Sequence, residues 1–374
     1  MIKISISQPM ICYKKRENKK KNMNSIKDDI LVAISGGVDS SVSTLLLKKE
    51  YEVRTLSFSI FDEQEEKTKV FKDRIRQLAK VLDVPNIFID IHTDFKKEVI
   101  CPFIDAYMSG NTPNPCVVCN REIKFKLLYD EAKNISPKCK ISTGHYAQVS
   151  YKDNRYFIKK HQDKNKDQSY MLWMLPQEYL AKTIFPLSEI KSKQETKNIA
   201  EDNNILEYIN AEESQDICFI PDNNYREYIK NSLGVEKIEG GDILFNGRVV
   251  GKHKGLPFYT IGQRDGLGIA LGFPVYVKEI NAQTNEMIVC EEKDLYKDRM
   301  RITNINLQKY EKLQEGYECT VKIRYHDPGH KAKVKKITDN TIEIEFEEPT
   351  KAITRGQSAV MYEGDDVVGG GIIM

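Results

Sequence analysis

The residues that most constrain the fold form an apolar run followed by a turn of small residues, ILVAISGGVDSS at positions 30–41. The apolar run is too short to span a membrane and rich in branched side chains, which predicts a strand buried on both faces. Apolar residues at positions 42–47 then predict a helix. The Ser, Gly and Asp residues of the turn let successive backbone N–H groups point at one anion. We therefore expect a phosphate-binding loop at this turn.

The turn differs from the common nucleotide P-loop. No Lys follows its glycines, and the spacing G-x-x-x-x-G-K-[ST] is absent. The string SGGVDS instead resembles the pyrophosphatase-type loop (PP-loop) of ATP-dependent adenylating enzymes. This resemblance implies that the loop holds the phosphates of ATP.

Charge is distributed unevenly along the 374 residues. The first 27 residues contain eight Lys or Arg and one acidic residue, which gives this segment a charge of +7. Since the formal net charge of the whole chain is +2, the remaining residues carry −5. The body is therefore not a generally basic RNA-binding surface, and nucleic acid contacts would come from local patches. The basic leader has no apolar core, which is unlike a secretion signal and suits a disordered tail. Met23, shortly before the first strand, is an alternative start.

Length, hydropathy and cysteine content bound the class of protein. A chain of 374 residues can hold two or three domains, each with its own core. No segment approaches the ~20 apolar residues that a membrane span needs, so we expect no membrane association. Eight cysteines are sparse for a disulfide scaffold of this length, which favours a reducing cytoplasm.

Strand and helix patterns alternate after the loop. Residues 53–59, 86–91 and 140–143 read as strands, and apolar residues at 71–82 recur at helical spacing. This alternation predicts a doubly wound parallel sheet of the α/β class, with ligands at the carboxyl ends of its strands. Gly144, after the fourth strand, would let backbone approach a nucleotide there. His145 is either a ligand or a structural hydrogen-bonding residue, and we favour the structural role.

The stretch NTPNPCVVCNREIKF at 111–125 lies between the third and fourth strands. Its prolines exclude a helix before Pro115, and an apolar helix follows. Cys119 is therefore expected at or near a helix N-terminus, where the dipole would lower its thiol pKa. The alternative is a half-exposed cysteine beside a helix cap. A second cysteine, Cys218, stands in SQDICFI, and only the fold could bring the two together.

Residues 146–159 predict a hairpin that turns at 152–154. Six basic and two acidic residues occur from 152 to 166, interleaved with Tyr156 and Phe157. The hairpin either contacts RNA phosphates and stacks on bases, or forms a solvated loop.

The C-terminal part reads as two further domains. An Asn-Gly turn at 246–247 predicts a hairpin, and the glycine-dense residues 255–272 suggest a loop-rich small domain. Short alternating strands at 287–290, 317–324, 332–337, 341–346 and 358–362 predict a closed antiparallel β-barrel. We expect a basic leader at 1–27, a PP-loop ATP-pyrophosphatase domain at 28–205, a small central α+β domain at 206–280 and the barrel at 281–374.

Several motifs together resemble the tRNA-specific 2-thiouridylases of the MnmA type. They are SGGVDSS, NTPNPCVVCNREIKF, TGHYA, KDQSY, SQDICFI, FYTIGQRDGLGI and RGQSAVMYEGDDVVGGGII. The resemblance implies an adenine nucleotide α-hydrolase-like PP-loop domain, a small central domain and a β-barrel that grip a tRNA anticodon stem-loop. It also implies a transferase that adenylates the C2 oxygen of the wobble uridine and replaces that oxygen with sulfur.

The resemblance assigns expected roles to individual residues. Cys218 would carry a persulfide, and Cys119 would be the nucleophile that closes a disulfide with it. ATP, with Mg²⁺, would be bound by Ala33, Ile34, Ser35, Gly36, Gly37, Val38, Asp39, Ser40, Phe58 and Gly144. The target base and tRNA would be contacted by Asn114, Pro115, Cys116, Lys166, Asp167, Gln168, Arg324 and Tyr325. Expected partners are the tRNAs for glutamate, glutamine and lysine, and a cysteine desulfurase or persulfide relay protein as sulfur donor.

Cys116 departs from the pattern, because many members of the family have Asp there. One hypothesis is that Cys116, Cys119 and Cys218 hold an iron–sulfur cluster or another metal, with one iron open to sulfide. The alternative, which we favour, is a tolerated replacement beside the base. Two other functions stay open. One is an ATP-dependent amidating ligase with the same loop that acts on a small molecule, and the other is an RNA-binding module without catalysis. A paralogue that thiolates a different RNA is a further alternative.

Overall fold

The computed structural model describes residues 27–209, 217–220, 223–233, 238–338 and 340–374. These residues form two compact units, each built from several stretches of the chain. The first unit comprises residues 27–92, 127–145 and 182–209, and the second comprises the other described residues. None of the described helices is long and apolar enough to cross a lipid bilayer. The leader predicted at 1–27 lies almost entirely outside the described residues, and the domain boundaries proposed above stay a prediction.

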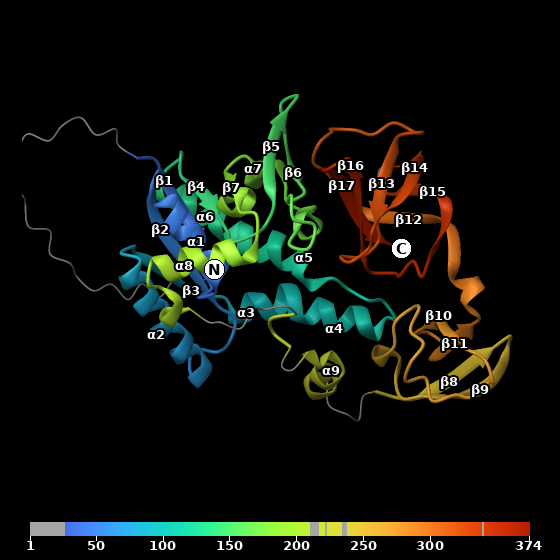
Figure 1. The fold of residues 1–374 in the computed structure, drawn as a ribbon. Helices are drawn as coiled ribbons and strands as arrows, with labels where there is room; N and C mark the ends of the chain where they lie inside the picture. The colour runs from blue at the N-terminus through green and yellow to red at the C-terminus, as the bar shows by residue number, and fades with distance from the viewer. Residues whose placement is uncertain (1–26, 210–216, 221–222, 234–237, 339) are drawn as a thin grey trace, which may run out of the picture. The chain divides into compact units, whose positions relative to one another are not determined.

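A parallel five-stranded sheet forms the centre of the first unit (Figure 1). Its strands, in the order β3-β2-β1-β4-β7, are β3 (Asn86–Asp90), β2 (Glu52–Ser59), β1 (Asp29–Ala33), β4 (Lys140–Ser142) and β7 (Thr183–Ile184). The central strand β1 is the apolar run of the sequence, and Ile30, Leu31 and Val32 are fully buried. The predicted parallel sheet is therefore confirmed.

The chain order of this sheet locates a ligand site. From β1 the chain moves outward through β2 to β3, and it then returns to place β4 on the other side of β1. The direction of winding thus reverses between β1 and β4, and ligands of open α/β sheets bind at the carboxyl ends of strands at such a reversal. The unit's helices are α1 (Val38–Leu47), α2 (Glu66–Val81), α6 (Lys126–Ile135), η4 (Pro186–Glu189), α8 (Lys193–Asp202) and η5 (Leu206–Tyr208).

A helical region that begins in the second unit carries the first cysteine motif. Helix α5 (Pro115–Cys119) continues through the π-helical turn η2 (Asn120–Phe125) into α6. Pro115 occupies the first turn, where its missing N–H costs no hydrogen bond. The unit's other helical segments are α3 (His92–Phe95), η1 (Lys96–Ile100), α4 (Cys101–Met108), η3 (Ser169–Leu172), α7 (Gln177–Leu180), α9 (Tyr225–Leu233), η8 (Leu256–Phe258) and η9 (Glu292–Leu295).

A small four-stranded sheet of order β10-β11-β8-β9 lies in the second unit. Its strands are β8 (Gly241–Phe245), β9 (Arg248–His253), β10 (Tyr276–Asn281) and β11 (Glu286–Cys290). The predicted Asn-Gly hairpin is confirmed, since Asn246 and Gly247 have φ of 48° and 76°. The prediction that 287–290 belongs to the barrel is wrong. This strand pairs with β10 and β8, and its Met287 and Val289 fill the core of the small sheet.

Six antiparallel strands close into the predicted C-terminal barrel (Figure 1). They are β12 (Tyr296–Leu307), β13 (Glu318–Lys322), β14 (His330–Ile337), β15 (Ile342–Lys351), β16 (Ser358–Glu363) and β17 (Asp366–Ile373). Pairing of β12 with both β15 and β17 closes the ring. The hairpin of β5 (Gln148–Lys152) and β6 (Arg155–Lys159) turns at Asp153 and Asn154 and joins β17 through Asp366.

Candidate active site

The PP-loop occupies the carboxyl end of β1, where the fold predicts a ligand. Hydrogen bonds within the loop fix its shape, because the Ser40 hydroxyl donates to the Gly37 carbonyl at 3.1 Å and accepts from the Ser35 amide at 3.2 Å. Gly37 precedes the first turn of α1, and no described side chain caps that turn. Amide N–H groups of a helix's first turn have no partner within the helix. They remain available for an anion such as a phosphate.

Gly144 follows β4 and packs directly on this loop. A Cβ atom added to Gly144 would lie 2.7 Å from the backbone nitrogen of Ser40 and 2.8 Å from the carbonyl carbon of Asp39. The sequence predicted that Gly144 lets backbone approach a nucleotide, and the close neighbour in the structure is the loop itself. His145 follows Gly144 in the chain, and its Nδ1 atom shares a hydrogen bond with the Thr143 hydroxyl at 2.7 Å. This contact agrees with a structural role for His145.

Lys193 is a candidate functional residue that the sequence reasoning missed. Its Nζ donates to both carboxylate oxygens of Asp39 at 2.8 Å, and its side chain is mostly buried. Helix α8 begins with a capping box in which Ser192 accepts from the Glu195 amide. The pattern S-x-x-E could have placed Lys193 at a helix start. Only the packing of α8 against α1 brings it to the loop.

The other predicted ATP residues lie around the same strand ends. Ala33 and Ile34 are buried at the end of β1, and Val38 is the first residue of α1. Phe58 lies half-buried in the neighbouring strand β2. All ten of the predicted ATP residues therefore belong to the first unit.

Cys116 and Cys119 lie one helical turn apart on α5. The prediction that Cys119 has a lowered pKa at a helix N-terminus is wrong for this structure. The helix begins at Pro115, so Cys119 lies beyond its first turn, and burial raises the pKa of the Cys119 thiol to about 12. Burial also raises the pKa of Cys116. Removal of solvent disfavours the charged thiolate, and burial is the largest cause of both shifts.

The segment of Cys218 is held by an aromatic side chain. Phe219, which is 5% exposed, makes edge contacts with Phe95 and Phe103, with ring centroids 5.6 and 5.4 Å apart. Tyr228 of α9 contacts it as well, at 5.4 Å. Cys218 itself is exposed. A buried anchor thus holds the segment of Cys218, whose thiol has a pKa raised by burial although the residue as a whole is exposed.

The three thiols lie close enough to affect one another's ionisation. Cys218 raises the pKa of both Cys116 and Cys119, beyond the larger effect of burial. A neighbouring charge has such an effect only at short range. All three residues belong to the second unit, so the fold brings together the two cysteine motifs. The seven cysteines that the structure describes are all free.

Lys124 is the cation that acts on this thiol cluster (Cys116, Cys119 and Cys218). It lowers the pKa of each of the three thiols and so opposes burial. Its Nζ donates to the Asn120 side chain at 3.1 Å, and the Asn120 amide donates to the Met171 carbonyl at 3.0 Å. Asn120 is 3% exposed. The position of the ammonium group is thus fixed by a buried neighbour on the same helix.

Three of the residues predicted to contact the target base or tRNA, namely Asn114, Arg324 and Tyr325, lie near Tyr170. Tyr325 donates from its hydroxyl to the Asp167 carbonyl at 3.1 Å, and its ring lies 6.0 Å from that of Tyr170. Asn114 and Arg324 both lower the pKa of Tyr170, against the dominant effect of burial. All eight predicted tRNA and base residues belong to the second unit, together with the thiol cluster.

Two of these residues have structural partners. The Asp167 carboxylate is buried and accepts from the amides of His161 and Ser169 at 3.0 and 3.1 Å. Gln168 exchanges hydrogen bonds with the backbone of Tyr146. Their side chains therefore shape this segment, and their neighbour Lys166 is half-buried.

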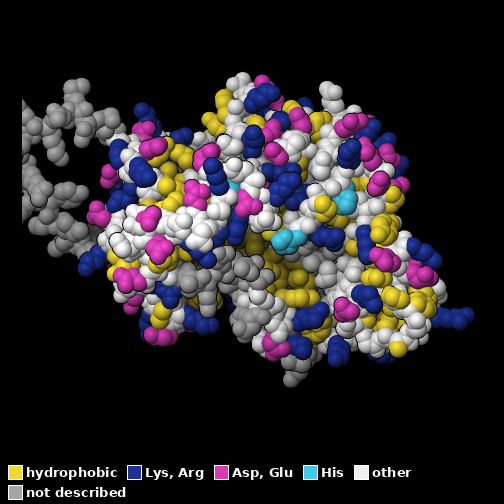
Figure 2. All heavy atoms as spheres, in the orientation of Figure 1, with side chains coloured by type: hydrophobic (Ala, Val, Ile, Leu, Met, Phe, Trp, Pro, Cys, Tyr) yellow, Lys and Arg dark blue, Asp and Glu magenta, His cyan; other side chains and the backbone are white. Residues whose placement is uncertain are grey.

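Of the two aromatic residues expected to stack on bases, Tyr156 is partly exposed and Phe157 is buried. Phe157 is 3% exposed and faces the core, so it is unsuited to stacking on a base. Tyr151 is 58% exposed and packs on Tyr156, with ring centroids 4.5 Å apart. On the face seen in Figure 2, basic and acidic side chains are intermixed, so this face is not generally basic.

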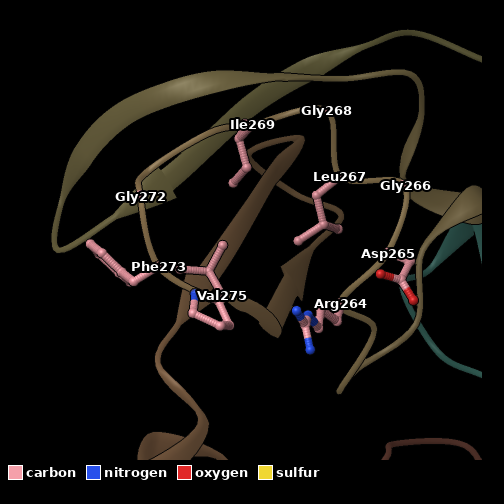
Figure 3. Close-up of a pocket in the computed structure, with 10 residues that line it drawn as sticks. Arg264, Asp265, Gly266, Leu267, Gly268, Ile269, Gly272, Phe273 and Val275 are labelled. Atoms are coloured by element: carbon pink, nitrogen blue, oxygen red, sulfur yellow. The ribbon is translucent and has the colours of Figure 1, made fainter.

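The glycine-dense stretch forms a loop around an open hollow of about 420 Å³ (Figure 3). The hollow is lined by residues 264–269 and 272–275, among them Arg264 and Phe273. It contains neither the PP-loop nor a cysteine. Among the described residues, no group of three or more His, Cys, Asp or Glu side chains could hold a metal ion.

The fold and these sites define a class of protein. It is an ATP-utilising PP-loop protein with a thiol cluster and a C-terminal β-barrel. Residues 28–222 match the family model described as the tRNA methyl transferase HUP domain, 226–291 its PRC-barrel domain, and 297–373 the aminomethyltransferase beta-barrel domain. The chain belongs to the family of tRNA-specific 2-thiouridylases of the MnmA type.

Curated relatives match almost the whole chain. The tRNA-specific 2-thiouridylase MnmA 1 of Clostridium botulinum (strain Okra / Type B1) is 42% identical over 93% of this chain and 98% of its own length. MnmA of Amoebophilus asiaticus is 41% identical over 93% of this chain and 95% of its own. Among solved structures, the U34-tRNA thiolase NcsA from Methanococcus maripaludis, with its [4Fe-4S] cluster, covers 55% of this chain and 65% of its own at 17% identity and a TM-score of 0.34. That likeness is too weak to support an argument.

Proposed function

We propose that this chain is a tRNA-uridine 2-sulfurtransferase, which uses ATP to replace the C2 oxygen of the wobble uridine with sulfur. The observation that carries the proposal is the grouping of Cys119 with an exposed Cys218 from a distant part of the sequence, in a chain that also holds a PP-loop. Adenylation needs the PP-loop, and sulfur transfer needs the two cysteines. The family relatives bear the name of this activity.

The first step makes the C2 oxygen a leaving group. That oxygen attacks the α-phosphorus of ATP, an O–P bond forms, and pyrophosphate departs. The loop's amides and hydroxyls hold the phosphates, which we assign to Ser35, Gly36, Gly37, Asp39 and Ser40. Lys193 orients the Asp39 carboxylate through its two hydrogen bonds.

The second step transfers sulfur from a persulfide on Cys218. Its terminal sulfur attacks C2, the C2–O bond breaks, and AMP leaves with the oxygen. The Cys119 thiolate then attacks the Sγ atom of Cys218, and the electron pair of the broken S–S bond stays on the transferred sulfur. The products are 2-thiouridine and a Cys119–Cys218 disulfide, which an external dithiol must reduce before the next turnover.

Mg²⁺ fits this site as a companion of ATP. Asp39 is the carboxylate of the loop, and its two oxygens already accept from Lys193. Mg²⁺ usually binds through one or two carboxylates together with phosphates and water. The phosphates would therefore supply most of its ligands, and the ion would neutralise their charge.

An iron–sulfur cluster is not supported by the described residues. Cys116, Cys119 and Cys218 do not form a group able to hold a metal, and we route no step through a cluster. Iron, sulfide and zinc analysis after anaerobic reconstitution, on the wild type and Cys116→Ala, tests this directly. Stoichiometric iron and sulfide lost in Cys116→Ala would contradict our assignment.

The proposed partners follow from the same chemistry. The tRNAs for glutamate, glutamine and lysine are the proposed substrates, and a cysteine desulfurase or persulfide relay protein would load the exposed Cys218. The reducing cytoplasm is the proposed compartment, because eight cysteines are sparse for a disulfide scaffold of this length.

Nucleoside mass spectrometry tests the proposed function. Total tRNA and rRNA from a deletion strain should lack 2-thiouridine derivatives in tRNA and regain them on complementation. Cys119→Ser and Cys218→Ser should fail to complement, whereas Cys101→Ser, which changes an exposed cysteine of the same unit, should succeed. Full activity of both serine variants would favour an amidating ligase, and complementation by Asp39→Ala would favour a non-catalytic RNA-binding module. A change confined to rRNA would indicate a different RNA substrate.

A further inference from the structure

Helix α2 brings an arginine to the PP-loop. Gly36 has φ of +81°, and a Cβ atom added to it would lie 3.3 Å from the Cδ1 atom of Ile75 and 3.8 Å from the Cδ atom of Arg74. Ile75 is fully buried and fixes α2 against the loop. The guanidinium group of Arg74 is bonded to that same Cδ atom, so it lies within reach of the loop.

Arg74 differs from its neighbours in its charge partners. Arg76 donates to Asp73 at 2.6 Å and lies over the Phe88 ring. Lys72 pairs with Glu63 in the same way. Arg74 is half-buried, yet no described residue accepts a hydrogen bond from it or forms an ion pair with it. A partly desolvated guanidinium group without a partner favours an anionic ligand.

The charge balance of the loop favours the same ligand. Lys193 also brings a positive charge to the loop, but the Asp39 carboxylate offsets it. The triphosphate of ATP carries several negative charges, and backbone amides supply only partial positive charge. A full positive charge beside Gly36 would therefore strengthen phosphate binding.

We propose that the Arg74 guanidinium group is a ligand of the phosphates bound at the PP-loop, both in ATP and in the pyrophosphate that adenylation releases. A guanidinium group can donate two parallel hydrogen bonds to phosphate oxygens. The inference rests on the proposed function, because it assigns this residue to the ATP site of the same enzyme. It adds a residue from outside the SGGVDSS motif.

Calorimetric binding of ATP, pyrophosphate and AMP to the full chain tests the proposal. Arg74→Gln should weaken ATP and pyrophosphate binding by about tenfold or more, as expected when at least one hydrogen bond to a charged group is lost, and leave AMP binding within about twofold. Arg74→Lys keeps the positive charge but loses the pair of parallel hydrogen bonds. Its affinity for ATP and pyrophosphate should lie between those of the wild type and Arg74→Gln. Arg76→Gln is the matched control from the same helix and should bind all three ligands like the wild type.

Two results would overturn the proposal. Wild-type affinity of Arg74→Gln for pyrophosphate would show that the guanidinium group does not touch the phosphates. An equal loss of ATP and AMP binding in both Arg74→Gln and Arg74→Lys, with unchanged thermal stability, would show that the arginine only braces the loop. The pyrophosphate measurement needs no tRNA and no sulfur, so its failure is distinguishable from failure of the thiolation reaction.

Discussion

At the scale of single residues, the two halves of the proposed reaction depend on fixed charges. The Lys193 ammonium holds the Asp39 carboxylate at the PP-loop. The Lys124 ammonium, held by Asn120, opposes the effect of burial on three thiols. Neither lysine was assigned a role from the sequence, because Lys193 reaches Asp39, and Lys124 comes near Cys218, only in the folded chain.

Replacement of Lys193 should impair adenylation. In Lys193→Met the Asp39 carboxylate loses both hydrogen bonds and repels the phosphates, so we expect ATP-dependent turnover to fall at least about tenfold. Lys197→Met, at an exposed position of the same helix, is the control. Formation of AMP in the presence of tRNA is the measurement. Equal rates for the two variants would remove Lys193 from the mechanism.

The Cys119 thiol should react faster as the pH rises. Its pKa of about 12 lies far above neutral pH, so the thiolate fraction grows about tenfold for each pH unit between 7 and 10. Mass spectrometry of alkylated Cys119 follows this rate. Lys124→Met should lower the rate at every pH in this range, while Lys124→Arg should not. A plateau near pH 8 in the wild type would contradict the assignment.

At the scale of elements, buried aromatic contacts position the reactive segment. Phe219 packs against α3, α4 and α9 and thereby holds Cys218, its neighbour in the chain. The three elements come from separate stretches of the sequence. The motif SQDICFI shows that an aromatic residue follows the cysteine, but its partners become evident only in the fold.

Truncation of Phe219 should slow sulfur transfer more than adenylation. Phe219→Ala removes the anchor, so Cys218 would meet Cys119 less often, and we expect at least a tenfold slower oxidation of the pair to a disulfide. AMP formation should stay near the wild-type rate. Phe219→Leu should recover most of the loss, and Phe273→Ala, an exposed ring, should cause none. Unchanged disulfide formation in Phe219→Ala would show that the anchor is dispensable.

The barrel contains a carboxylate, that of Glu363, whose protonation should lower the stability of the folded state. Tyr317 and Tyr310 donate to Glu363 at 2.6 and 2.7 Å, and with Lys309 they lower its pKa from 4.5 to about 2. A lowered pKa in the folded state adds stability that is fully present above pH 4.5 and lost as the pH falls toward 2.

Thermal unfolding as a function of pH checks this contribution. The melting temperature of Glu363→Gln should lie below that of the wild type at neutral pH, and the difference should shrink as the pH falls from 4.5 toward 2. Glu347→Gln, at an exposed position of β15, is the control. A pH-independent difference would show that hydrogen bonding by the side chain, and not its charge, supplies the stability.

At the scale of the whole molecule, local sequence patterns predicted most elements but not their assembly. The strand, loop and helix at 29–47 and the turns at 153–154 and 246–247 follow from short-range rules, and the structure has them. Residues 287–290 were correctly predicted to form a strand. The sheet to which this strand belongs was not, because it is set by pairing with β8, which is distant in the sequence. The pKa of Cys119 depends on burial, which its position in a helix does not reveal.

Tracing the displaced oxygen tests the central claim most directly. A tRNA with ¹⁸O at C2 of the wobble uridine would be incubated with the enzyme, ATP and a persulfide donor, and the AMP would be analysed by mass spectrometry. We predict one ¹⁸O atom in AMP for each 2-thiouridine formed, because the oxygen departs on the adenylate. Formation of 2-thiouridine with unlabelled AMP, or with ADP in its place, would contradict the account.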